Sequence, residues 1–273
     1  MMRAVVAAAM LAGTGSGSGA RAGQIGPEAL GSLPAADVVI LGEVHDNPIH
    51  HANQARAVAA IRPAALVFEM FGPDEAARAQ GVARGDAAAL GAALGWEGSG
   101  WPDFALYHPI FTAAPDALIA GGALPRGTVR RAITEGAAAP FGPDAARFGL
   151  EQPLDPADQA AREALQAEAH CNALPPELLP GMVAAQRLRD AALARATLEA
   201  LAAAGGPVVV ITGTGHADRL RGIPAALGHA APDLRVLALG QTEADPGPDA
   251  PFDLWIVTDP QPRPDPCAAF KGG

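Results

Sequence analysis

Short apolar runs alternate with segments of helical spacing at both ends of the chain. The first run, residues 36–41 (ADVVIL), is rich in β-branched side chains and stops at Gly42, which is typical of a buried strand. Helical spacing follows over residues 48–62, with Pro48 in the first turn. A second apolar run, residues 64–70 (AALVFEM), and another helical segment repeat the order. The strand–helix–strand–helix order predicts a parallel sheet.

The middle of the chain, about residues 86–205, has a different pattern. It contains no convincing β-rich run, and its apolar positions recur at helical spacing between glycine and proline breaks. Three further apolar runs, which we interpret as strands, cover residues 207–213, 234–240 and 253–258. The whole pattern predicts an α/β fold: a parallel-sheet core with helices on both faces and a large helical insertion in the middle of the chain. Because the sheet needs both ends of the chain, we expect residues 23–273 to form one domain.

The first 22 residues have the pattern of a secretory signal peptide. Arg3 supplies a positive charge, residues 4–12 are almost all apolar, and ARA at 20–22 suits a cleavage site with small residues. The apolar run is too short to span a bilayer. We therefore expect cleavage after Ala22 and a periplasmic or secreted protein without a transmembrane helix. The alternative is a disordered cytosolic N-terminus.

Charge and cysteine content narrow the possible partners. The formal net charge is −10 and the chain has one lysine, so its surface should repel a polyanion, and we expect no nucleic-acid binding.

Cys171 and Cys267 are the two cysteines. They could pair in an oxidising compartment, but two cysteines make no pattern, so the sequence leaves their pairing open.

Four polar side chains follow the predicted strands at the edge where ligands bind in open α/β sheets. Glu43 and His45 come after the first strand. Glu69 ends the second strand, and His216 follows the third. Two glutamates and two histidines at one edge suit a divalent metal such as Mn, Co or Zn, or a metal-free set of acid and base groups. The alternative is a structural role for each, as a helix cap or in an ion pair with a surface arginine.

Other histidines lie on the helix that follows the first strand. His50 and His51 are adjacent, and neighbouring helix positions diverge by about 100°. We therefore expect one of them to face the strand ends and the other to face solvent or a partner chain. On the longest predicted helix, Gln186 and Asp190 lie one turn apart on one face, where a buried polar pair would support a site.

An aromatic segment, residues 101–111 (WPDFALYHPIF), holds the single tyrosine, Tyr107, and the adjacent His108. Phenolate and imidazole both ligate haem iron in proteins, and the aromatic residues around them would give apolar walls to a flat ring. The alternative is an aromatic cluster that packs the helical insertion onto the sheet.

Several common reaction types lack their motifs in this sequence. There is no GxxxxGK phosphate loop, no GxSxG nucleophile motif and no HExxH zinc motif. Gly213 and Gly215 match part of a dinucleotide fingerprint, but Asp218 stands where its third glycine belongs.

The motif segments together resemble those of the ChaN-like proteins, a bacterial haem-binding and iron-regulated family. The matching segments are residues 42–54, 68–70, 101–111, 182–194 and 213–224, in the family's order. The resemblance implies an α/β core with a helical insertion and a haem held between two protomers. Tyr107, His108, His50 and His51 are the candidate haem ligands. ChaN-like members are typically lipoproteins, whereas this sequence has no lipobox cysteine, which favours a form without a lipid anchor.

The ChaN-like family is similar, at superfamily level, to the Tiki metalloproteases and the erythromycin esterases. That superfamily is marked by two GxxH motifs and two glutamates. Here Gly42 to His45 and Gly213 to His216 fill the motifs, and Glu43 and Glu69 supply the glutamates. Two hypotheses follow. The first is a haem-binding protein that serves iron or haem acquisition, as a monomer or a homodimer. The second is a metal-dependent or metal-free hydrolase of esters or amides that uses Glu43, His45, Glu69 and His216. A third reading is a secreted α/β domain whose polar strand ends are structural.

Overall fold

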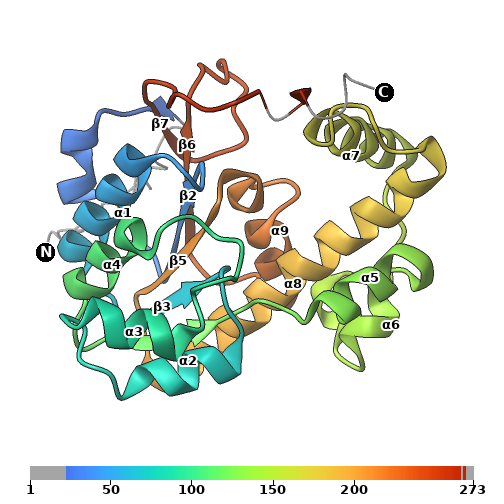
Figure 1. Ribbon diagram of the computed structural model, residues 1–273. Helices are drawn as coiled ribbons and strands as arrows, with labels where there is room; N and C mark the ends of the chain where they lie inside the picture. Colours follow the sequence, from blue (N-terminus) through green and yellow to red (C-terminus); the bar gives the residue numbers. More distant parts are fainter. Residues whose placement is uncertain (1–22, 266, 269–273) are drawn as a thin grey trace, which may run out of the picture.

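A computed structural model describes residues 23–265 and 267–268, so the predicted signal peptide lies outside the described residues. Seven parallel strands form one sheet in the order β1-β7-β6-β2-β5-β3-β4 (Figure 1). The strands are β1 (Gly23–Gln24), β2 (Val38–Glu43), β3 (Ala65–Phe68), β4 (Leu118–Gly121), β5 (Val208–Gly213), β6 (Val236–Thr242) and β7 (Leu254–Val257). The predicted α/β fold with a parallel sheet is confirmed.

Helices make up most of the rest of the described chain. The α-helices are α1 (Pro48–Ile61), α2 (Pro73–Gln80), α3 (Ala87–Leu94), α4 (Phe104–Ala113), α5 (Arg126–Glu135), α6 (Ala138–Phe141), α7 (Pro156–Ala169), α8 (Leu179–Ala204) and α9 (Ile223–Ala230). Four short 3-10 helices join them: η1 (Pro27–Ser32), η2 (Ala145–Phe148), η3 (Pro176–Leu178) and η4 (Thr214–Ala217).

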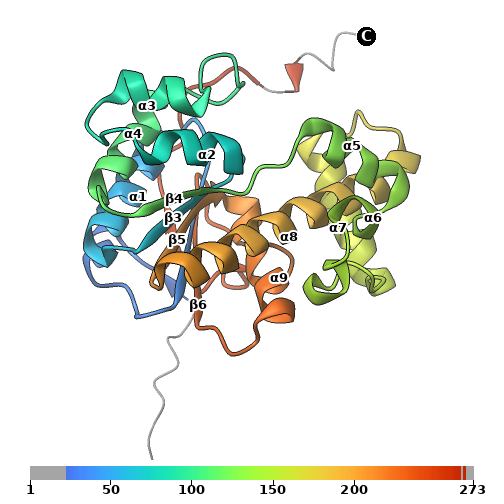
Figure 2. The same ribbon diagram turned by 90° about the horizontal axis from the view of Figure 1, so that it is seen from below.

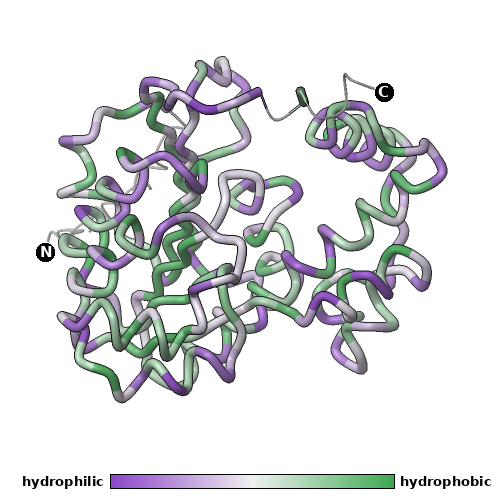
Figure 3. The backbone as a smooth tube through the Cα atoms, in the orientation of Figure 1, coloured by the Kyte–Doolittle hydropathy of each residue, from purple (hydrophilic) through white to green (hydrophobic). Residues whose placement is uncertain are grey.

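Helices cover both faces of the sheet, as the sequence predicts. Along β2, Val39 and Leu41 pack in one hydrophobic cluster with residues of helices α1 to α4, and Val38 and Ile40 pack in another with residues of α8 and α9. These two groups of helices lie on opposite faces of the sheet (Figure 2). A strand buried on both faces needs apolar residues at every position, which explains why these strands read as continuous apolar runs. The hydrophobic residues accordingly concentrate along the strands (Figure 3).

The expectation that residues 86–205 are helical throughout is wrong at one place, because β4 lies in this region and forms an edge of the sheet. Its sequence, LIAG, is short and poor in β-branched residues, so it carries little strand signal. Gly121 is required there: a Cβ at this position would lie 2.4 Å from the carbonyl oxygens of Phe71 and Gly72. The two-residue strand β1 was also not predicted.

The long helix α8 connects the sheet to an outer group of helices. Its C-terminal part packs on β3, β4 and β5. Its N-terminal part contacts α5, α6 and α7, which lie away from the sheet (Figure 1). None of the helices in the described ranges combines the length and the apolarity that a bilayer crossing requires.

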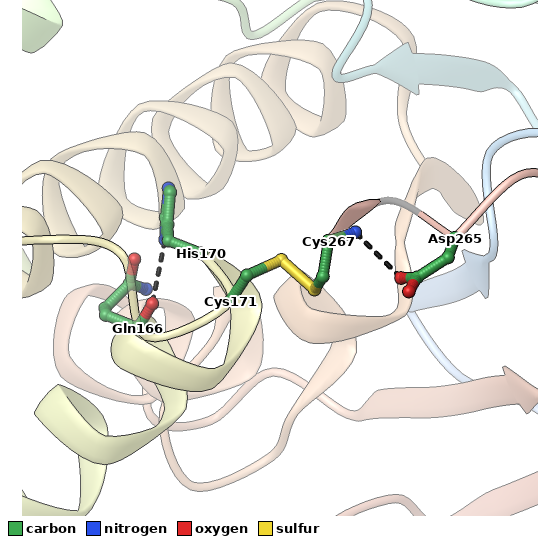
Figure 4. The surroundings of a disulfide bond; sticks show 5 residues. All are labelled: Gln166, His170, Cys171, Asp265 and Cys267. Carbon is green, nitrogen blue, oxygen red and sulfur yellow. Dashed lines mark hydrogen bonds between the residues drawn. A yellow bond between two sulfur atoms is a disulfide. The ribbon is translucent and has the colours of Figure 1, made fainter. Parts of the chain in front are cut away.

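The segment after β7 crosses back to the outer helices and is joined to them covalently. Cys267 forms a disulfide with Cys171, which follows α7, so the pairing left open by the sequence is present in the structure (Figure 4). Next to it, Asp265 accepts a hydrogen bond from the backbone N–H of Cys267 at 2.8 Å. Arg263 fixes the same segment to the loop before α1 through an ion pair with Asp46 at 2.7 Å.

Candidate functional site

The carboxyl ends of β2, β5 and β3 lie side by side and bring the predicted site residues together. Glu43 at the end of β2 is in register with Gly213 at the end of β5, and Glu69 follows β3 on the other side of β5. A Cβ on Gly213 would lie 3.0 Å from Nε2 of His45 and 3.6 Å from Oε2 of Glu69. The absence of a side chain at Gly213 therefore lets His45 and Glu69 approach the same point. The structure places Glu43, His45, Glu69 and His216 at one edge of the sheet.

Four residues form the first half of the site, which we call the Glu43 cluster: Glu43, His45, His51 and Tyr107. Oε1 of Glu43 accepts hydrogen bonds from the Tyr107 hydroxyl at 2.7 Å and from Nδ1 of His45 at 2.9 Å. Burial and the neighbouring Glu43 carboxylate raise the pKa of Tyr107 far above its usual value, so Tyr107 acts as a neutral donor. Tyr107 therefore holds Glu43 in place from beneath the site.

His51 completes the Glu43 cluster. Its Nε2 donates to the backbone carbonyl of His45 at 2.8 Å, so this nitrogen must carry a proton. Its Nδ1 lies 3.4 Å from Oε2 of Glu43, and both atoms are buried without another hydrogen-bond partner in the described structure. Two unprotonated acceptors would repel each other there. The pair is stable when it holds one proton between the two atoms.

His45 is the accessible member of the Glu43 cluster. Its side chain is 36% exposed, and its Nε2 has no hydrogen-bond partner within the described residues, while Nδ1 is bound to Glu43. Burial lowers the pKa of His45, but the hydrogen bond to Glu43 and the charge of Glu69 outweigh burial, so the pKa lies above its usual value. The edge of the Trp101 ring lies against the imidazole, with ring centroids 4.9 Å apart.

The second half of the site, the Glu69 cluster, consists of Glu69, Thr212, Arg189, Asp190 and His216. Oε2 of Glu69 accepts hydrogen bonds from the Thr212 hydroxyl and from the backbone N–H of Gly213, both at 2.8 Å. Oε1 pairs with Nη2 of Arg189 at 2.6 Å. Burial raises the pKa of Glu69, but the charges of His216 and Arg189 dominate and hold it well below its usual value. Glu69 is therefore a buried, fully paired carboxylate.

His216 links the two acids of the Glu69 cluster. Its Nδ1 lies 2.5 Å from Oδ1 of Asp190, and its Nε2 lies 3.3 Å from Oε1 of Glu69. Burial lowers the pKa of His216, but the charges of Glu69 and Asp190 outweigh burial and raise it to about 9. His216 is thus an imidazolium at neutral pH, held between two buried carboxyl groups. Arg189 also lies close by, with Nη2 3.0 Å from Nε2 of His216, and both of these cations pair with Glu69.

The face of α8 predicted from spacing contributes to the site. Gln186 and Asp190 both contact His216, the first with Nε2 3.1 Å from the imidazole Nδ1. The sequence did not indicate that Arg189 pairs with Glu69. The helical spacing could have placed Arg189 at the site, because positions 186, 189 and 190 share one helix face.

The candidate haem ligands on α1 are both buried, so the expectation that one of them faces solvent or a partner is wrong. His50 accepts a hydrogen bond from the backbone N–H of Val44 at Nδ1 and bonds the hydroxyl of Thr258 through Nε2, each at 2.8 Å. Burial lowers the pKa of His50 to about 4. His50 therefore ties the loop before α1 to the segment after β7, and His51 belongs to the Glu43 cluster.

Part of the aromatic segment, residues 101–111, packs onto the sheet, and part of it lies at a cleft. Phe111 stacks on Phe68 of the sheet, with ring centroids 4.5 Å apart, so this part packs the segment onto the sheet. His108 bonds the carbonyl of Arg84 through Nε2 at 2.8 Å, next to the Phe104 ring. Trp101, in contrast, lies at an open cleft.

That cleft, of about 590 Å³, opens beside the Glu69 cluster. Its walls come from the ends of β3 and β4, the loop before α4, and helices α5 and α8. The lining includes the apolar Met70, Trp101, Val129 and Leu193, the acid Glu69, and the arginines Arg126, Arg130 and Arg189. The volume is in the range of small-molecule sites. The sequence did not predict Arg126 and Arg130 at the site, although they lie four positions apart and therefore on one helix face.

The arrangement gives no direct support to a divalent-metal site. Across residues 23–265 and 267–268, no group of three or more His, Cys, Asp or Glu side chains is placed to hold a metal ion. Both glutamates already have partners within the protein: Arg189 and His216 neutralise the charge of Glu69, and the Tyr107 hydroxyl donates a hydrogen bond to Glu43. The roles predicted for Glu43, His45, Glu69 and His216 in catalysis or metal binding stay predictions.

A family model matches most of the chain, and a solved structure shares its fold. A family model described as "Haem-binding uptake, Tiki superfamily, ChaN" matches residues 29–227. A solved structure described as "Cofacial heme binding to ChaN of Campylobacter jejuni" has a TM-score of 0.59 and 19% identity, covering 82% of this chain and 87% of that chain. A succinoglycan biosynthesis protein aligns with a TM-score of 0.36 and 14% identity over 76% of this chain and 66% of that chain, too remote to carry an argument. A comparison with curated proteins finds no match.

Proposed function

The chain belongs to the ChaN family of haem-binding uptake proteins in the Tiki superfamily, and we propose that it binds haem in the cleft beside Glu69 and Trp101. The observation that carries the proposal is the composition of this cleft. A haem needs apolar walls for its ring, positive groups for its two propionates and a nitrogen, oxygen or sulfur ligand for its iron. The cleft lining supplies the apolar walls and the arginines, and His45, whose ring contacts Trp101, lies beside it.

We propose further that the protein acts outside the cytoplasm in haem or iron acquisition, and that a homodimer is its working form. The disulfide between Cys171 and Cys267 supports an oxidising compartment, because such bonds are rare in the cytosol. The predicted signal peptide would deliver the chain there. The homodimer and the role in acquisition rest on the resemblance to ChaN-like proteins.

The haem proposal is tested by titrating hemin into the purified mature chain. We expect saturable binding near one haem per chain, a shift and sharpening of the Soret band, and a change in association state by light scattering. Val129→Glu places a carboxylate in the apolar wall, and because a charge is expensive to bury there, hemin binding should weaken by about tenfold or more. Leu165→Glu, on the exposed face of α7, is the matched control and should bind as wild type. A wild-type titration without a spectral shift would refute haem binding.

Hydrolysis of an ester or amide is a second candidate, favoured by the pairing of Glu43 with His45. A carboxylate that holds Nδ1 of a histidine, with Nε2 open to solvent, is the arrangement of a general base. If the site hydrolyses esters, His45→Ala should lower turnover of 4-nitrophenyl acetate by about 10²-fold or more, as expected when a general base is lost. His229→Ala, outside the site, is the control. Equal rates in both variants, or no wild-type turnover on an ester and peptide panel, would rule this candidate out.

A further inference from the structure

We propose a second ligand site, separate from the haem cleft: a small pocket between α7, α8 and α9 binds a free inorganic oxyanion of the phosphate or sulfate type through Arg162, Arg187 and Arg221. The pocket has a volume of about 80 Å³. Among the described residues, it shares no lining residue with the cleft beside Glu69. The proposal therefore does not rest on haem binding.

Three separate elements bring their guanidinium groups to this pocket. Arg162 lies on α7, Arg187 lies on α8, and Arg221 precedes α9. Asp158 joins two of them, because its Oδ2 accepts from Nε of Arg162 at 2.8 Å and its Oδ1 accepts from Nε of Arg221 at 3.0 Å. These two guanidinium groups therefore lie beside one carboxylate, and Arg187 lines the same pocket.

The three arginines keep hydrogen-bond donors that the protein does not use. Arg187 donates to the carbonyls of Gly149 and Gln152, at 2.7 and 3.0 Å, through Nη2 alone. Nη1 of Arg162 donates to the carbonyl of Arg221 at 3.2 Å. Within the described residues, no partner is left for Nη2 of Arg162, for Nε and Nη1 of Arg187, or for Nη1 and Nη2 of Arg221. An ion with several acceptor oxygens can accept from these donors together.

The surroundings of the pocket carry more positive than negative charge. Arg187 forms no ion pair in the part of the chain that the structure describes, and the two other arginines share Asp158. Asp190 also lines the pocket but is paired with His216, and Asp218 lies near enough to interact with the two arginines that share Asp158. Even with Asp218 counted, three guanidinium groups are matched by two carboxylates. An anion would balance the remaining charge.

Arg187 gains the most from a bound anion. Burial lowers the pKa of its guanidinium group, and the nearby charge of Arg162 lowers it further. An anion in the pocket would oppose both effects, because it stabilises the charged form of the side chain.

The size of the pocket limits the ligand to a small ion. Its volume of about 80 Å³ corresponds to roughly two or three water molecules of about 30 Å³ each. Sites for organic ligands are far larger, roughly 300–1,000 Å³. Apolar side chains, among them Leu150, Leu154 and Leu220, line the rest of the pocket and offer no partner to further polar groups of a ligand. A tetrahedral oxyanion is compact and carries four acceptor oxygens, so it suits both the volume and the arginines.

The site is tested by differential scanning fluorimetry with sodium phosphate, each protein being compared with itself in sodium chloride of equal ionic strength. We expect phosphate to raise the melting temperature of the wild type saturably, because a ligand that binds the folded state stabilises it. Arg187→Gln should weaken the phosphate affinity by about tenfold or more, since it removes charge-assisted hydrogen bonds. Arg131→Gln removes the same charge from the exposed face of α5 and should respond as wild type. Equal melting temperatures of the wild type in phosphate and chloride, or an undiminished phosphate affinity in Arg187→Gln, would overturn the proposal.

Two further measurements keep the test decisive if Arg187→Gln does not fold. Ala225→Leu leaves all three arginines in place but fills part of the pocket, so it should also weaken phosphate binding by about tenfold or more. Phenyl phosphate, whose ring exceeds the pocket, should bind the wild type more weakly than phosphate does. An unchanged phosphate affinity in Ala225→Leu would contradict binding in this pocket. Tighter binding of phenyl phosphate would overturn the assignment to a free ion.

Discussion

Replacing His216 with leucine is expected to lower the free energy of unfolding by about 3–5 kcal/mol at neutral pH, the usual cost of leaving a buried charge without its partner. In the wild type, the imidazolium of His216 lies between Glu69 and Asp190, and all three side chains are about 4% to 5% exposed. Leucine fills a similar volume but carries no charge. Only Arg189 would then remain to offset two buried carboxyl groups.

The measurement is equilibrium urea unfolding of the wild type and of His216→Leu. His229→Leu is the matched control, because it also removes an imidazole but no carboxylate pairs with His229 in the described structure. It should change the free energy of unfolding by less than about 1 kcal/mol. A loss of the same small size in both variants would mean that the Glu69 cluster does not depend on a charged His216.

We expect the free energy of unfolding to depend differently on pH in the wild type and in His216→Leu. The charges of Glu69 and Asp190 raise the pKa of His216 from its usual 6.5 to about 9 in the folded protein. The stabilising effect of His216 is therefore complete below pH 6.5 and is lost as the pH rises through 9. The wild type should therefore lose about 3 kcal/mol of unfolding free energy over this interval, at 1.36 kcal/mol per pKa unit. His216→Leu should lack this loss. A parallel decline in both proteins would contradict the assignment.

Removing the disulfide is expected to lower the free energy of unfolding by roughly 4 kcal/mol, since a cross-link that closes a loop of this length strongly restricts the unfolded chain. Cys171 and Cys267 are 96 residues apart in the sequence. The double variant Cys171→Ser/Cys267→Ser removes the cross-link without leaving a free thiol. In the folded state, the bond also holds the segment after β7 against the end of α7 (Figure 4).

The check is urea unfolding without reductant, with reduced wild-type protein as the control. The reduced protein should unfold at the same urea concentration as the double serine variant. Part of the segment should stay attached in both, because Arg263 still pairs with Asp46 and Glu243. An unchanged unfolding midpoint after reduction would show that the cross-link contributes little to stability.

The sequence alone determined the central strands β2, β3, β5, β6 and β7 and the edge at which the site forms. Buried parallel strands need continuous apolar runs, and such runs are visible in the sequence. The residues that follow them must meet at one edge, because parallel strands all end there. This explains why the sequence alone predicts that Glu43, His45, Glu69 and His216 lie together.

The tertiary structure alone decided which of these groups is available for chemistry. Both ring nitrogens of His50 are engaged because Val44 and Thr258 lie against them, whereas Nε2 of His45 has no hydrogen-bond partner among the described residues. Glu69 is neutralised by Arg189, which is far away in the sequence. The edge strand β4, the disulfide and the position of Arg126 and Arg130 in the cleft likewise depend on neighbours across the fold. Periodicity reports which face of an element is buried, but hydrogen bonds and charges depend on which residues lie opposite, and only the packing of distant segments fixes that.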